Sequence, residues 1–356
     1  MVNIFQKVAV AGAAIALGSL GTLPAKATTL GYDGLYVFGD SLSDTGNVFS
    51  ATQGQYPAQP YDRGRFSNGP NWVDDLGQDL GLTPTPVAQI QLNNAPAPQG
   101  INFAFGGATT GTANTLNTSF NLPEDGTGLP GLVQEIGSFA QTSPVADPQA
   151  LYILWAGAND YLPTNSKSFT PFQTPTNTVT NLSQSVQLLA SLGARNILIA
   201  DLPDLGQTPL VNKSSSASTA LNNLTSAHNQ LLSKTESDLS QSLPGVNLIP
   251  LDLNQRFKDI TADPSKFGFT NVSDSCFVNP SANSPGSVCS NPDQYLFWDS
   301  SHPTTAVHKL IAEEALNTIE SKSVPEPTAD NALWLLSFGF IVKKILSSKR
   351  SGRQSL

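Results

Sequence analysis

Apolar runs and amphipathic stretches alternate along the chain between residues 28 and 322. Five runs are almost continuously apolar, as expected of parallel strands buried on both faces, and they cover 35–38, 101–105, 151–157, 195–201 and 246–252. Three stretches repeat apolar residues at helical spacing, over 181–192, 214–243 and 304–319. This alternation predicts an α/β fold, in which a parallel sheet of about five strands carries helices on both faces.

Small polar residues follow the first three predicted strands. The first strand leads into FGDSLSDTGN, which carries Ser41, the second into the pair Gly106–Gly107, and the third into GAND, which contains Asn159. The segment WDSSHP, with Asp299 and His302, stands just before the last predicted helix. Because sites of open α/β sheets lie beyond the carboxyl ends of the strands, we expect these residues to gather at that edge.

These residue types together suit acyl transfer. A serine hydroxyl is a weak nucleophile at neutral pH and needs a base to remove its proton. Of the three histidines in the sequence, only His302 follows a carboxylate, Asp299, by three residues in a predicted turn; that carboxylate can orient the ring and stabilise the imidazolium. The attacked carbonyl becomes an oxyanion, for which the N–H groups of Ser41 and Gly107 and the Asn159 amide are candidate donors.

Each of these residues also has a simpler structural interpretation. Ser41 alone is a typical helix N-cap, and glycine pairs and Asn159 are common in turns. His228 falls on a long polar helix and is expected to be structural, whereas His308 is expected to be a solvated helix residue. The occurrence of all four polar groups at the ends of successive elements favours a site.

The four groups resemble the sequence blocks of the GDSL/SGNH hydrolase superfamily, in its lipase-like branch, through FGDSLSDTGN, NFAFGGATT, WAGANDYL and FWDSSHPT. The resemblance implies a three-layer α/β/α sandwich with a flavodoxin-like parallel sheet. It also implies that Ser41 is the nucleophile, that His302 with Asp299 is the base, and that Gly107 and Asn159 complete the oxyanion hole with Ser41. The Gly-x-Ser-x-Gly motif of ordinary α/β-hydrolases does not occur in the sequence.

Both ends of the chain are typical of processing signals. Residues 1–27 combine Lys7, an apolar stretch and a small-x-small pattern that closes at Ala27, which predicts a signal peptide removed by signal peptidase. In the tail, 323–356, Pro-Glu-Pro precedes a short apolar segment and a basic end, an order that resembles the PEP-CTERM sorting signal. The resemblance implies an exosortase-type enzyme as a partner. The alternative is a membrane-surface helix, because the apolar segment is shorter than the roughly 20 residues that cross a bilayer.

The net charge limits the classes of possible partner, and the cysteines bear on a possible disulfide. The formal net charge of −9 argues against nucleic acid as a partner. The two cysteines, Cys276 and Cys289, stand in the predicted hydrolase domain, 28–322, and an oxidising compartment favours a disulfide between them. We expect no metal site, and serine-based acyl transfer requires no cofactor.

The sequence therefore predicts an exported serine esterase or lipase, secreted or held in a bacterial cell envelope. Two alternatives stay open: an acyltransferase in which an alcohol replaces water, and a non-catalytic envelope or matrix binding protein on the same fold. The loops 48–71 and 112–128 follow the first two blocks and are expected to line the acyl site. Their apolar and aromatic residues suit a lipid, an aryl ester or an acetylated glycan equally.

Overall fold

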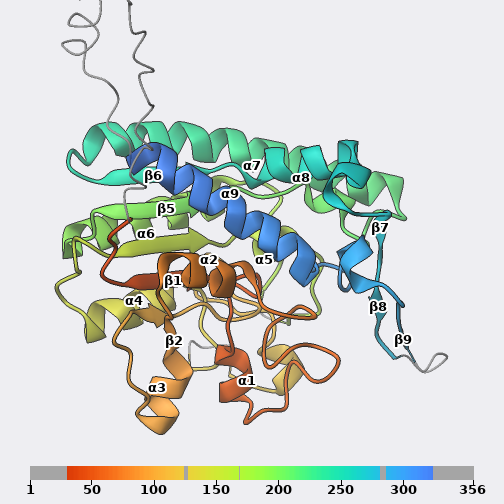
Figure 1. Cartoon of the computed structure of the whole chain (residues 1–356), viewed down its shortest axis with the longest axis horizontal. Helices are drawn as coiled ribbons and strands as arrows, with labels where there is room; N and C mark the ends of the chain where they lie inside the picture. Colours follow the sequence, from red (N-terminus) through yellow and green to blue (C-terminus); the bar gives the residue numbers. More distant parts are fainter. Residues whose placement is uncertain (1–29, 124–126, 168, 281–285, 324–356) are drawn as a thin grey trace, which may run out of the picture. The chain divides into compact units, whose positions relative to one another are not determined.

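The computed structural model describes residues 30–123, 127–167, 169–280 and 286–323 (Figure 1). The predicted signal peptide, and the predicted sorting segment beyond residue 323, lie outside the described residues. The described helices and strands all belong to one compact unit that begins at Tyr32. None of the described helices is both long and apolar enough to cross a membrane.

The main sheet of the described chain has six parallel strands in the order β2-β3-β1-β4-β5-β6. Their bounds are β1 Leu35–Gly39, β2 Thr85–Pro86, β3 Ile101–Asn102, β4 Leu151–Trp155, β5 Asn196–Ala200 and β6 Asn247–Leu251. Strand β2 was not predicted from the sequence; it has two residues and lies at the sheet edge, where a proline is tolerated. Without β2 the order is the flavodoxin-like one, so the predicted fold class is confirmed.

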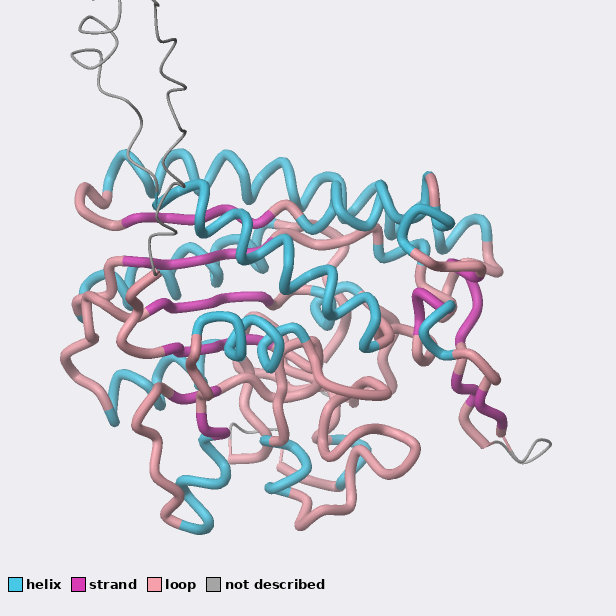
Figure 2. The backbone as a smooth tube through the Cα atoms, in the orientation of Figure 1, coloured by secondary structure: helices cyan, strands magenta, loops and turns pink. Residues whose placement is uncertain are grey.

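Helices cover both faces of this sheet and give three layers (Figures 1 and 2). On one face lie three helices that pack together, α2 (Trp72–Leu80), α8 (Leu253–Ala262) and α9 (Thr305–Ser323). On the other face lie α4 (Leu132–Thr142), α6 (Thr176–Leu192) and α7 (Ser215–Ser242). The shorter helices are α1 (Asn47–Ala51), α3 (Val87–Asn93) and α5 (Ala158–Tyr161), with 3-10 turns at η1 (Thr118–Phe120), η2 (Leu205–Gln207), η3 (Pro264–Phe267) and η4 (Pro292–Gln294).

Aromatic rings fill the space between the sheet and α4. Phe38 on β1 and Phe103 just after β3 stack with ring centroids 5.2 Å apart, and Phe139 of α4 meets both rings edge-on. Tyr152 on β4 also contacts the Phe139 ring, and all four side chains are buried. Burial of such large rings anchors β1 and β4 at the centre of the sheet. The polar residues that follow β1 and β4 are therefore attached to firmly packed strands.

The predicted helices 181–192, 214–243 and 304–319 correspond to α6, α7 and α9, although α6 begins earlier, at Thr176. The second predicted strand, 101–105, is shorter than expected. Beyond Asn102, side chains supply part of the pairing: Asn102 Oδ1 accepts the Ala104 N–H at 2.8 Å, and Glu135 Oε1 accepts the Phe105 N–H at 3.1 Å. The Phe105 N–H also donates to the Gly39 carbonyl at 3.1 Å, so hydrogen bonds to β1 continue up to the glycine pair.

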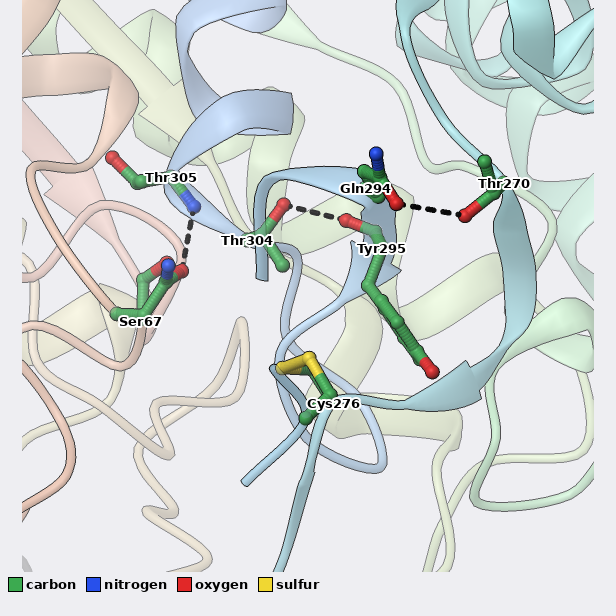
Figure 3. The surroundings of a disulfide bond; sticks show 9 residues. Ser67, Thr270, Cys276, Gln294, Tyr295, Thr304 and Thr305 are labelled. Carbon is green, nitrogen blue, oxygen red and sulfur yellow. Dashed lines mark hydrogen bonds between the residues drawn. A yellow bond between two sulfur atoms is a disulfide. The ribbon is translucent and has the colours of Figure 1, made fainter. Parts of the chain in front are cut away.

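The segment between α8 and α9 forms two small sheets. Strand β7 (Asn271–Ser275) pairs in parallel with β10 (Tyr295–Phe297), and β8 (Phe277–Val278) pairs antiparallel with β9 (Ser287–Val288). Cys276 and Cys289 form a disulfide that closes the β8–β9 hairpin (Figure 3). Thr304 Oγ1 donates to the Tyr295 carbonyl at 2.8 Å, which ties the start of α9 to this segment.

Candidate active site

Ser41 stands just past the end of β1, at the carboxyl edge of the sheet. At Gly39, φ is +150° and a Cβ atom would lie 2.1 Å from the Trp155 carbonyl oxygen, so a larger residue does not fit. Two residues beyond Ser41, the Ser43 N–H donates to the Asp40 carbonyl at 3.0 Å and closes a tight turn. The close packing of β1 on β4 and this turn together fix the serine.

The structure brings Ser41, His302 and Asp299 into one chain of hydrogen bonds. His302 Nε2 lies 2.8 Å from Ser41 Oγ, and His302 Nδ1 lies 2.7 Å from Asp299 Oδ2. The other carboxylate oxygen, Oδ1, accepts the backbone N–H groups of Ser301 and His302, each at 2.8 Å. When the ring is neutral, an ionised Asp299 holds the proton on Nδ1, so that Nε2 can accept the Ser41 hydroxyl.

Burial and charge act in opposite directions on the pKa values of Asp299 and His302. Burial alone raises the pKa of Asp299, but the His302 charge and hydrogen bonds from His302, Tyr61 and Ser301 lower that pKa to about 2. Burial lowers the pKa of His302, while the charge and hydrogen bond of Asp299, and the charge of Asp40, raise it above its ordinary value. An ionised carboxylate therefore lies beside an imidazole of increased basicity.

Gly107 and Asn159, the other two predicted donors, lie on neighbouring turns. Asn159, on α5, borders the same cavity as Ser41, and its Nδ2 donates to the Ala108 carbonyl at 3.0 Å. Gly107 directly precedes Ala108 and has φ +78°; a Cβ atom there would lie 2.6 Å from Asn114 Oδ1. Within the described residues, the N–H groups of Ser41 and Gly107 donate no hydrogen bond, so both are available to a bound molecule.

A buried carboxylate decides which amide of the glycine pair stays available. Asp44 is fully buried, and its oxygens accept four backbone N–H groups at 2.6–3.2 Å, from Gly46, Asn47, Val48 and Gly106. Burial raises the pKa of Asp44 to about 6, although these hydrogen bonds oppose the rise. Because the Gly106 amide is bound to Asp44, the Gly107 amide is the one left for a ligand.

A cavity lies beside Ser41 and His302. The volume in which the centre of a water molecule fits is about 80 Å³. Apolar side chains from four separate parts of the sequence line its wall, among them Leu162, Leu202, Leu205, Phe257 and Leu296. Polar side chains also border it, among them Asp204, Asn254 and Lys258. Asn254 links the other two, because its Nδ2 donates to Asp204 Oδ1 at 3.1 Å and its Oδ1 accepts from Lys258 Nζ at 2.5 Å.

The described residues of the loops 48–71 and 112–128 do not line this cavity, which differs from the expectation for these loops. Their aromatic rings pack on one another instead. Tyr56 meets Phe66 and Phe120 edge-on, with centroids 5.7 and 5.1 Å apart, and Phe66 lies 5.3 Å from the His302 ring. Of these rings, Phe66 is the one that packs against His302.

The other two histidines are both buried. His228 is buried, as expected of a structural residue, and its Nδ1 lies 2.8 Å from the Tyr161 hydroxyl. His308 is only 1% exposed, so the expectation of a solvated residue is wrong; α9 buries this face. Burial lowers the pKa of His228 to about 4, and burial together with the His302 charge lowers that of His308 to about 3. Among the described residues, no three His, Cys, Asp or Glu side chains are grouped to hold a metal ion.

Sequence reasoning missed two side chains that touch this site. Tyr61 Oη donates to Asp299 Oδ2 at 2.6 Å, and Asp40 is a buried carboxyl that borders the cavity. Burial raises the pKa of Asp40 to about 7, against a hydrogen bond from the Leu42 N–H. Asp40 could have been found from its place next to the serine. No local signal marks Tyr61, because 238 positions separate it from Asp299.

The protein is therefore an α/β protein in which a serine, a histidine and an aspartate share one chain of hydrogen bonds at the carboxyl edge of the sheet. Residues 35–315 match the family described as GDSL-like Lipase/Acylhydrolase, and the chain belongs to this family.

Two relatives span most of the chain. Phosphatidylcholine-sterol acyltransferase of Aeromonas hydrophila is 29% identical over 332 residues, which cover 81% of this chain and 90% of that protein. GDSL esterase/lipase At5g22810 of Arabidopsis thaliana is 29% identical over 323 residues, with 79% and 88% covered. A crystal structure of a lipolytic G-D-S-L family member from Veillonella parvula aligns at TM-score 0.41 and 15% identity, covering 80% of this chain and 96% of that one.

We expect the Asp299→Asn substitution to lower the pKa of His302. The charge that raises this pKa is then gone, whereas burial, which lowers it, remains, so the pKa should fall below its ordinary value of about 6.5. NMR titration of the imidazole resonances measures the change. The spectrum is simple, because the chain has three histidines and the other two stay neutral around pH 7.

Asp274→Asn is the matched control for this titration. Asp274 is an exposed carboxylate paired with Lys213, and its loss should leave the His302 pKa unchanged. An unchanged or higher His302 pKa in Asp299→Asn would contradict the electrostatic account of the pair.

Proposed function

We propose that the protein is a serine esterase or lipase that hydrolyses carboxylic esters through an acyl-enzyme. The observation that carries the proposal is the chain of hydrogen bonds from Ser41 Oγ through His302 to Asp299 beside an apolar-walled cavity. A base within 2.8 Å of the serine oxygen is what an otherwise weak nucleophile needs. Membership of the GDSL-like Lipase/Acylhydrolase family supports the same chemistry.

In the proposed first step, His302 Nε2 removes the Ser41 proton while Oγ attacks the ester carbonyl carbon. The carbonyl electron pair moves onto oxygen, and Asp299 stabilises the imidazolium that forms. The oxyanion accepts hydrogen bonds from the N–H groups of Ser41 and Gly107 and from the Asn159 amide. The imidazolium then gives its proton to the departing alcohol oxygen as the carbon–oxygen bond breaks.

In the second step, His302 Nε2 removes a proton from water, whose oxygen attacks the acyl carbon. The imidazolium then returns that proton to Ser41 Oγ as the bond between Oγ and the acyl carbon breaks and the acid leaves. The apolar wall beside the serine favours a substrate with an apolar acyl or aryl group, because burial of that group removes it from water. A lipid or aryl ester therefore fits this cavity better than an acetylated glycan.

An acyltransferase is the second candidate, because an alcohol in place of water could accept the acyl group from the same acyl-enzyme. The relative from Aeromonas hydrophila that matches over 90% of its length is named an acyltransferase, which favours keeping this candidate. The two activities separate when an ester is supplied with an added alcohol, because transfer yields a new ester and hydrolysis a free acid.

Export is part of the proposal. The predicted signal peptide, 1–27, and the PEP-CTERM-like tail, 323–356, place the hydrolase domain, 28–322, in the secreted fraction or the cell envelope. Signal peptidase and an exosortase-type enzyme are the corresponding partners. The Cys276–Cys289 disulfide suits an oxidising compartment.

The purified protein should hydrolyse p-nitrophenyl butyrate, and Ser41→Ala and His302→Ala should each lower kcat/KM by at least about 10³-fold, because they remove the nucleophile and the base. Steady-state release of p-nitrophenolate measures both effects. Butyrate should be preferred over acetate by about tenfold, since each buried methylene contributes about 0.8 kcal/mol.

Ser233→Ala, which removes an exposed hydroxyl on α7, is the control for the loss of a serine and should retain full activity. Full activity in Ser41→Ala would refute the proposed mechanism. The absence of hydrolysis and of transfer in folded wild-type protein would favour a binding protein instead.

Asn159→Ala should lower kcat/KM by about 10²–10³-fold, because one oxyanion donor is lost in the transition state. The effect should fall on kcat more than on KM, since the charge develops only during reaction. Asn247→Ala, at the opposite end of the sheet, serves as the control. A change in KM alone would show that Asn159 binds the ground state and does not stabilise the oxyanion.

A further inference from the structure

We propose that the Tyr61 hydroxyl is a positioning group, which shares the charge of Asp299 and thereby sets the basicity and orientation of His302. This inference rests on the proposed function, because it concerns the same carboxylate and histidine. It adds a fourth member to the hydrogen-bonded chain, from a loop in which the sequence shows no catalytic motif.

The hydrogen bond between Tyr61 and Asp299 is short, and both residues are buried. Tyr61 Oη lies 2.6 Å from Asp299 Oδ2, the same oxygen that lies 2.7 Å from His302 Nδ1. Tyr61 is 9% exposed and Asp299 4% exposed. Distances of this size are typical of a hydroxyl that donates to a carboxylate, and such bonds are roughly twice as strong as neutral ones.

The hydroxyl is the donor at every pH at which the protein would work. Burial, the charge of Asp299 and the hydrogen bond to Asp299 raise the pKa of Tyr61 far above its ordinary value, although a hydrogen bond from Asn279 lowers it. The phenol therefore keeps its proton, and Asp299 keeps its charge. With Ser301 and His302 on Oδ1, and Tyr61 and His302 on Oδ2, both carboxylate oxygens carry two donors.

The Tyr61 ring is held in place by an aromatic cluster. Phe277 and Trp298 meet it edge-on with centroids 5.6 and 6.3 Å away, and Phe66 lies at 6.4 Å. The half-cystine Cys276 belongs to the same buried cluster. A ring packed on several sides has little freedom to turn, so its hydroxyl stays directed at Asp299.

The consequence for His302 follows from charge. A proton donated to Oδ2 draws negative charge away from the imidazole, so the hydroxyl restrains the rise that Asp299 causes in the His302 pKa. Without it, the full charge would face Nδ1, and the ring would stay protonated to a higher pH. A protonated ring cannot take the Ser41 proton. On the acid limb of the pH profile, activity would therefore begin to fall at a higher pH.

The other titratable groups around the pair do not change when this hydroxyl is removed. The Asp40 charge raises the pKa of His302. The His302 charge lowers the pKa of the neutral His308, and the Asp299 charge raises the pKa of Tyr56, so neither of these two groups carries a charge that acts on the pair. The hydrogen bonds of Tyr56 to described residues are made by its backbone N–H and carbonyl, both with Thr52. Tyr56→Phe, which removes only the hydroxyl, is therefore the matched control for Tyr61→Phe.

In the full-length protein, Tyr61→Phe should lower kcat by about tenfold, since a hydrogen bond to a charged group is lost while the ring remains. The acid limb of the kcat/KM profile should also move to higher pH, and Tyr56→Phe should change neither quantity. A folded Tyr61→Phe protein with an unshifted acid limb would overturn the proposal, whether or not kcat falls, because packing alone would explain a change in rate.

A second readout does not need turnover and separates this inference from the proposed function. The proton on His302 Nδ1 should give a far-downfield NMR resonance that shifts in Tyr61→Phe and stays in place in Tyr56→Phe. If wild-type protein hydrolyses no ester, the proposed function fails, yet this resonance still tests the hydrogen bond. A resonance at the same position in both variants would contradict the inference.

If Tyr61→Phe does not fold, 3-fluorotyrosine at position 61 keeps both the ring and the hydroxyl. Its more acidic hydroxyl is a better donor, so the acid limb should move to lower pH. An acid limb that stays at the wild-type position in this protein would overturn the proposal.

Discussion

The hydrogen bond between Ser41 Oγ and His302 Nε2, 2.8 Å long, joins residues 261 positions apart, and much of the fold serves to hold its two ends. The serine end is fixed where β1 packs against β4. The histidine end is fixed by Asp299, and the turn that carries it is tied to the first loop, because Ser67 Oγ donates to the Pro303 carbonyl at 2.9 Å. Neither half forms a site without the other, which is why the site appears only in the folded chain.

Buried carboxylates organise the rest of this sheet edge. Glu135 accepts the N–H groups of the last residue of β1 and of Phe105 beyond β3. Asp44 accepts the Gly106 N–H, and Asp160 Oδ2 accepts the Thr110 N–H at 2.8 Å. Burial raises the pKa of each, which shows the cost of removing an ion from water. Several hydrogen bonds per carboxylate offset that cost. Each bond also fixes a turn, so the donors proposed for the oxyanion are held rigid before a substrate arrives.

The parts of this protein that could be predicted are those encoded locally. Four of the five predicted strands match β1, β4, β5 and β6 closely, because buried parallel strands are continuous apolar runs. Helix α2 carried a capping box at Asn71 that the sequence analysis did not use. The partner of Asp299 and the burial of His308 were out of reach, because both depend on segments far apart in the chain. The cavity wall was assigned to the wrong loops for the same reason, since its side chains come together only by folding.

The most direct test of the account is to trap the covalent intermediate. A p-nitrophenyl ester is mixed with the enzyme, quenched in acid within milliseconds, and the digest is mapped by mass spectrometry. We expect an acyl group on the Ser41 hydroxyl of the wild-type protein and none in Ser41→Ala. Turnover with no acyl group on Ser41, or with the acyl group on another residue, would contradict it.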